Sequence, residues 1–166
     1  MNEPEFWLRG PVDGVPDLLQ PAAHALLQAN SEIRQVLANF ANNKLWEKPF
    51  DMASVGFHLQ HIAGVLDRLY TYADGKSLSN SQLKYLSEEG LENDQLTVAV
   101  LLDKLNERVQ LSISKLKEIN TDSLVEFRAV GRNKLPSTVL GLIFHAAEHT
   151  MRHTGQLLVT AKVVIQ

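Results

Sequence analysis

Four long segments of the chain carry apolar residues at alternating intervals of three and four, the repeat that puts side chains on one face of an α-helix. One segment runs from about Thr97 to Ile119, and its apolar face comprises Val98, Leu102, Leu105, Val109, Ser112, Leu116 and Ile119. Helices of this kind bury their apolar faces against one another. We therefore expect an all-α protein built as a four-helix bundle.

The length of 166 residues suits one domain with its own core, so we expect a single domain over residues 1–166. Residues 1–15 contain Gly10, Pro11 and Gly14 and are predicted to form an irregular N-terminal arm. A run of exposed aromatic side chains is unfavourable, so Phe6, Trp7 and Leu8 are expected to pack this arm against the body.

Capping signals predict the limits of the first two helices. Proline is tolerated in a first turn, so the first helix is expected to begin between Pro16 and Pro21 and to end at the polar cluster 42–44. The second is expected to begin after the N-cap Ser54 and to end at residues 74–75, where glycine can adopt the left-handed conformation.

Local sequence signals also predict the limits of helices and loops in the second half of the chain. Ser79 and Gln82 resemble a capping box and predict a short connecting helix. Residues 124–133, interrupted by a glycine, are predicted to form a loop or crossover. Residues 136–138 are predicted to open the last helix, and its tail, residues 163–165, either extends it or pairs elsewhere. The inward face of that helix comprises Leu142, Ala146, His149, His153, Leu157 and Thr160.

Histidines take inward positions on two of the predicted helices. Of the six histidines in the chain, His145, His149 and His153 recur at every fourth position, which places them on successive turns of one helix. The second helix has His58 and His61 on a face that continues through Val65, Leu69 and Tyr72. Two helix faces that are expected to meet in the core therefore both carry imidazoles.

Inward imidazoles have two interpretations. A lone histidine on an apolar face is more often a hydrogen-bonded core residue than a ligand. An unsatisfied buried polar group costs about 1–3 kcal/mol, and a metal ion that binds neutral imidazole removes that cost. On geometry alone, the structural and the metal-binding interpretations of His61, His149 and His153 are evenly balanced.

Composition limits the chemistry. The chain has no cysteine, so a bound metal would have His, Asp, Glu or water as ligands, and a reducing cytoplasm is the expected location. A net charge of -3 gives no electrostatic reason to expect nucleic-acid binding. The absence of an 18-residue apolar run and of a charged-then-apolar leader predicts no membrane span and no secretory signal. His24 and an Asp67–Arg68 ion pair are predicted to be ordinary surface features.

Two segments resemble a known family. Residues 54–64 (SVGFHLQHIAG) and 148–156 (EHTMRHTGQ), together with Trp46 and Pro49 before the second helix, are similar to the DinB/YfiT-like superfamily of proposed metalloenzymes. The resemblance spans nearly the whole chain. It implies an up-down-down-up bundle with a long crossover, to which the short helix around Leu83 would belong. It also implies a homodimer.

The resemblance further implies a ligand set. In that family one histidine of the second helix and two of the last helix hold a divalent metal, and the remaining positions are open to water or substrate. Position by position, these ligands would be His61, His149 and His153. His61 is favoured over His58 because the family's ligand precedes an apolar pair, here residues 62–63.

Four neighbouring residues are candidates for supporting roles. His58 is expected to be a rim residue or an outer partner of a ligand. His145 lies about 40° round the helix from His149, which indicates a pocket wall or outer partner rather than a ligand. Glu148 and Gln156 accompany the ligands in the motif and could orient an imidazole through its other nitrogen, with an exposed helix-face pair as the alternative.

Such a site would hold a divalent transition metal, with zinc and nickel favoured and iron and copper as alternatives. Members of the resembling superfamily include metal-dependent thiol S-transferases. The leading hypothesis is therefore an enzyme whose metal activates a water molecule or a low-molecular-weight thiol against a small-molecule substrate. The alternative is a non-catalytic stress-response metal-binding module or a helical interaction module.

Overall fold

The computed structural model describes residues 3–165 and is dominated by five α-helices. These are α1 Gln20–Val36, α2 Val55–Ala73, α3 Asn80–Glu88, α4 Val98–Glu118 and α5 Val139–Val164. Strands β1 Phe127–Val130 and β2 Leu135–Thr138 form an antiparallel hairpin. Single 3₁₀ turns occur at Phe6–Leu8, Asp17–Leu19, Asn42–Lys44, Pro49–Asp51 and Thr121–Ser123. None of the helices within residues 3–165 has the length and apolar character that a membrane crossing requires.

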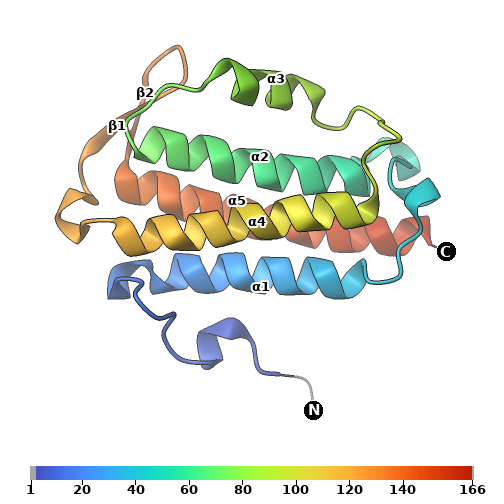
Figure 1. Ribbon diagram of the computed structural model, residues 1–166, viewed down its shortest axis with the longest axis horizontal. Coiled ribbons are helices and arrows are strands. Elements are labelled where there is room, and N and C mark those ends of the chain that lie inside the picture. The colour runs from blue at the N-terminus through green and yellow to red at the C-terminus, as the bar shows by residue number, and fades with distance from the viewer. Residues whose placement is uncertain (1–2, 166) are drawn as a thin grey trace.

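The four long helices form the expected bundle. Helix α2 packs against α4 and α5, and α1 packs against the same two helices from the other side. In Figure 1, α1 and α5 run in one direction whereas α2 and α4 run in the other. The chain therefore has the predicted up-down-down-up order. Because the parallel neighbours α2 and α4 cannot be joined by a tight turn, residues 74–97 cross back over the bundle, and this crossover contains α3 (Figure 1).

The buried face of α2 differs from the predicted one. Leu59, Ile62 and Leu66 are fully enclosed, whereas His61 and Leu69 are only half-buried. Helix α2 is covered by α4, α5 and the crossover helix α3, so more of its circumference is buried than a simple stripe predicts. The buried face of α2 is therefore rotated relative to the predicted one, which places His61 at the edge of the core rather than inside it.

The loop before α2 fits closely against the helix. Leu45 is buried, and its carbonyl accepts the Gly56 N–H at 2.8 Å, while Ser54 caps the helix by accepting the Phe57 N–H at 3.1 Å. A Cβ at Gly56 would lie 2.5 Å from Cζ3 of Trp46. Only glycine allows the indole to lie this close to the first turn of α2.

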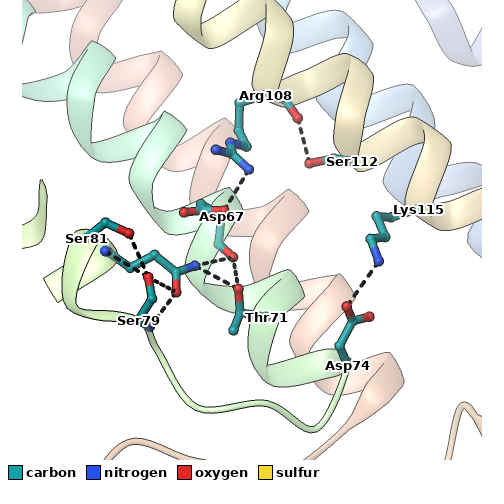
Figure 2. Close-up of polar contacts among 9 residues, drawn as sticks. Asp67, Thr71, Asp74, Ser79, Ser81, Arg108, Ser112 and Lys115 are labelled. Carbon is teal, nitrogen blue, oxygen red and sulfur yellow. Dashed lines mark hydrogen bonds and ion pairs between the residues drawn. The ribbon is translucent and has the colours of Figure 1, made fainter.

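Polar contacts attach α3 and α4 to α2. The Nε2 of Gln82 in α3 donates to Thr71 Oγ1 of α2 at 2.8 Å. Figure 2 shows Arg108 of α4 pointing toward Asp67 of α2. The predicted capping box at Ser79 is present. The Asp67–Arg68 pair predicted from the sequence is wrong: Asp67 instead pairs with Arg108 of α4 at 2.6 Å, and Arg68 is buried and faces another acidic residue.

The region between α4 and α5 is not the predicted loop. It forms the β-hairpin, in which the Arg128 Nε–H donates to the carbonyl of Ala73 at 2.7 Å and so joins β1 to the end of α2. Each strand has only four residues, too few to show a clear alternation in the sequence. The predicted opening of the last helix belongs to β2, with Thr138 as the N-cap of α5, and the C-terminal tail continues α5 to Val164.

Polar contacts with α1 and the burial of Val15 both hold the N-terminal arm. Trp7 and Leu8 are 63% and 57% exposed, so the expectation that both pack against the body is wrong, and Phe6 is only half-buried. Gln28 Oε1 accepts the Phe6 N–H at 3.0 Å, and His24 Nε2 lies 3.0 Å from the carbonyl of Gly10. His24 thus lies beneath the arm and is not the ordinary surface residue that was expected.

The Trp46 contact gives a stability prediction. Gly56→Ala should destabilise the protein by about 1–3 kcal/mol, because the added methyl group overlaps a packed indole. The matched control is Gly155→Ala in α5, where a Cβ meets nothing within 4 Å and should stabilise the helix by about 0.5–1 kcal/mol. Denaturant unfolding measures both, and equal effects of the two substitutions would contradict the packing argument.

Candidate metal centre

The contact between α2 and α5 brings together three histidines from distant parts of the chain. Ligand nitrogens of His61, His149 and His153 all lie within 4.8 Å of one another. The Nε2 atoms of His61 and His149 are 2.9 Å apart, and the ring centroids of His61 and His153 are 4.5 Å apart. The three residues that the sequence singled out as ligands therefore form one cluster.

The sequence correctly placed His149 and His153 on the inward face of α5. Ala146 and Leu157 on the same face are fully buried, whereas the two imidazoles between them are half-buried. The cluster consequently lies where the core meets the surface. A ligand could reach it without the bundle opening.

His61 has a charged outer partner that the sequence analysis missed. Its Nδ1–H donates to Glu89 Oε2 at 2.7 Å, and the other oxygen of Glu89 accepts from Arg68 at 2.6 Å. The Glu89 side chain is only 4% exposed. Glu89 follows the last residue of α3, and no spacing rule connects it with a histidine 28 positions away.

His58 is not a rim residue but a buried neighbour of the cluster. It is 3% exposed, and its Nδ1 lies 3.0 Å from Nδ1 of His153. One of these nitrogens must donate to the other, so this contact ties His58 to one of the three clustered rings. His58 thus has the position of an outer partner, one of the two roles expected for it.

The other three candidates lie outside the cluster. His145, expected as a pocket wall or outer partner, is exposed, and its Nδ1 is 3.4 Å from Glu148. Glu148 forms an ion pair with Arg152, one turn along the same helix. His145, Glu148 and His149 also have ligand atoms within 4.8 Å, but the carboxylate of that group is already paired. Gln156 is exposed and has no side-chain hydrogen bond to any residue in the range 3–165.

The electrostatics of the cluster favour neutral imidazoles. Burial, followed by the proximity of other imidazoles, lowers the pKa of His58, His149 and His153 from 6.5 to about 4. At neutral pH these rings therefore carry lone pairs that a metal can use. The Nδ1 of His149 is buried and has no hydrogen-bond partner among the described residues. Convergent neutral nitrogens, one backed by a carboxylate, fit a divalent transition metal.

Comparison with known proteins agrees with this architecture. The family model of the DinB superfamily matches residues 25–157, a span that includes all three clustered histidines and Glu89. The chain belongs to the DinB superfamily. A crystal structure of a conserved protein from Enterococcus faecalis is similar to this DinB protein, with a TM-score of 0.70 and 19% identity over 89% of this chain and 96% of that one. At this identity the likeness concerns the fold. No curated protein matches the sequence.

The low pKa values predict the pH dependence of the metal-free protein. A histidine whose pKa is lowered by folding binds fewer protons in the folded state than in the unfolded state. The stability of metal-free protein should therefore be complete above pH 6.5 and decrease as the pH falls from 6.5 towards about 4. Denaturant unfolding at pH 7.5 and pH 5 measures the loss. Midpoints near 6.5 for these three rings in an NMR titration would contradict the assignment.

Proposed function

We propose that this DinB protein is a metal-dependent enzyme in which His61, His149 and His153 hold a divalent transition metal, with zinc or nickel favoured over iron or copper. The observation that carries the proposal is the convergence of three imidazole nitrogens within 4.8 Å at a half-buried position. The proposed nucleophile is a low-molecular-weight thiol or a water molecule.

The ligand number supports a catalytic rather than a structural metal. A structural zinc site usually has four protein ligands, whereas a catalytic site leaves a position open. Within residues 3–165, the cluster around His61 has three members, and the nearest additional groups contact the imidazoles on their Nδ1 side. His58 and Glu89 are therefore arranged to orient ligands rather than to complete the coordination.

A bound divalent metal would supply Lewis acidity, which lowers the pKa of a coordinated thiol or water. The residues of the chain hold the ligands in place: Glu89 fixes the proton of His61 on Nδ1, and His58 contacts His153. The ring of Phe57 stacks on His61 with centroids 5.0 Å apart and an interplanar angle of 13°. It gives the cluster an apolar wall that restricts access of solvent on that side.

A hollow beside the cluster offers room for a substrate. It measures about 550 Å³, within the usual range of ligand pockets, and its lining includes His58, Arg152 and Gly155. Met52, Ala53 and Val159 are the apolar residues of its lining. A substrate with an apolar body would fit these walls, and His58, which lines the hollow and contacts His153, connects the hollow with the cluster.

The first test uses a thiol-transfer reaction. Glutathione and 1-chloro-2,4-dinitrobenzene are supplied as thiol and electrophile: the sulfur bonds to the ring carbon, chloride leaves with the bonding pair, and the thiol proton passes to solvent. Zinc- or nickel-loaded protein should accelerate this reaction or the hydrolysis of 4-nitrophenyl acetate. His153→Ala should reduce the acceleration by at least about 100-fold.

The control for this test is His145→Ala, which removes an exposed imidazole from the same helix. It should retain both the metal content, measured by elemental analysis of untagged protein, and the turnover. Turnover that persists in His153→Ala or in metal-free protein would refute the proposal. Metal binding without either reaction would support the non-catalytic module. Metal loss in His145→Ala would indicate that the metal binds instead at the exposed group on α5 that contains His145.

The hollow gives a separate prediction. Gly155→Leu should place a leucine side chain in the hollow. The backbone should tolerate it, because a Cβ at this helical position meets no neighbouring atom within 4 Å. We expect KM for an apolar electrophile to rise about tenfold or more while the metal content stays unchanged. Steady-state kinetics measures the effect, with Gly155→Ala as the smaller control. An unchanged KM would show that the substrate binds elsewhere.

A further inference from the structure

We infer that the crossover between α2 and α4 is a working part of the metal centre: Glu89 positions His61, so that metal binding and the attachment of the crossover to α2 stabilise each other. This inference rests on the proposed metal site. It assigns to Glu89 the role of a positioning residue, acting through His61 and not on a substrate.

The first observation is that both oxygens of Glu89 are occupied by residues of α2. One accepts from His61 at 2.7 Å and the other from Arg68 at 2.6 Å, and the side chains of Glu89 and Arg68 are nearly buried. A buried carboxylate is strongly unfavourable without such partners. The position of Glu89 is thus determined by α2, although the residue belongs to the crossover.

The second observation is that α2 leaves space for this carboxylate. A Cβ at Gly64 would overlap Oε1 of Glu89 and would lie 2.6 Å from the guanidinium of Arg68. Glycine in the middle of a helix is unfavourable relative to alanine. Its presence one turn before Arg68 is explained by the close approach of Glu89.

The third observation is that the backbone beside Glu89 is fixed. The Gly90 N–H donates to Oε1 of Gln60, a buried residue of α2, at 2.7 Å. Gly90 has a φ of +81°, and a Cβ there would lie 2.9 Å from the ring of Phe57. These contacts set the direction from which the Glu89 side chain reaches His61.

The rest of the crossover is weakly held. Helix α3 has no buried residue, and its Leu83 and Leu86 are partly exposed. Its attachment depends on polar contacts with α2, chiefly the Gln82–Thr71 hydrogen bond and the Tyr85 O–H donated to the carbonyl of Gln60 at 3.2 Å. Segments with few buried apolar contacts open at low free energy. The His61–Glu89–Arg68 contacts are therefore a large part of what holds this segment closed.

A carboxylate that accepts the Nδ1–H of a histidine directs the Nε2 lone pair of that ring towards a metal, and removal of such a partner typically costs 10–100-fold in metal affinity. Coupling between two equilibria is reciprocal. If attachment of Glu89 strengthens metal binding, metal binding must strengthen attachment of the crossover by the same factor.

The test measures zinc affinity by competition with a chromophoric chelator and amide hydrogen exchange in the crossover, with and without zinc. Glu89→Gln and Gly64→Ala should each weaken zinc binding by about 10–100-fold. Zinc should slow exchange of residues 80–96 in the parent protein by a similar factor and have little effect in Glu89→Gln. The matched control is Glu88→Gln, an adjacent exposed carboxylate that pairs with Lys84 and should leave zinc affinity within about twofold.

A second variant tests the coupling without altering the charged residues. Gln82→Ala removes the α3–α2 hydrogen bond and should both speed exchange in the crossover and weaken zinc binding by a few-fold. Near-UV circular dichroism of each metal-free variant establishes that the bundle is folded.

The outcomes separate the two proposals. Failure of the parent protein to bind zinc or nickel refutes the proposed function and this inference together. Tight binding that is unchanged in both Glu89→Gln and Gly64→Ala refutes only the role of Glu89. Weaker binding in those variants, without any change of exchange on adding zinc, refutes the coupling to the crossover.

Discussion

The antiparallel contact between α2 and α5 is the feature on which the rest of this structure depends. It buries the apolar faces of two long helices, and it is also the contact that sets His61 beside His149 and His153. The same packing that stabilises the bundle therefore assembles the candidate centre. Any change that alters the register of these two helices would alter both, since a shift of one turn moves a ring by about 5.4 Å.

Local patterns explain how much could be predicted from the sequence. Helix limits follow from caps such as Ser54 and Ser79, whose hydroxyls accept backbone N–H groups three positions along, and the inward face of α5 follows from its own periodicity. Geometry alone left the structural and the metal-binding interpretations of the inward histidines evenly balanced. The resemblance to the DinB superfamily then selected His61 as the ligand from the second helix. Its grouping with two histidines of α5 agrees with that choice.

The features that were missed depend on tertiary contacts. Glu89 reaches His61 only because α3 folds back along α2, and neither its position nor its neighbours in the sequence indicate a buried carboxylate. The exposure of Trp7 arises in the same way, because polar side chains of α1 hold the arm and leave the indole outside. The buried face of α2 was misjudged since its third neighbour, the crossover, is not encoded in the periodicity of α2 itself.

The up-down-down-up order has a consequence for biosynthesis. A ribosome releases the chain from its N-terminus, so α1, α2 and the crossover emerge well before α5, which spans Val139–Val164. Until that last helix inserts between α1 and α2, the nascent chain presents His61 without its two partners. The centre can consequently be loaded only after α5 has emerged from the ribosome, and the docking of α5 is the folding step that creates it.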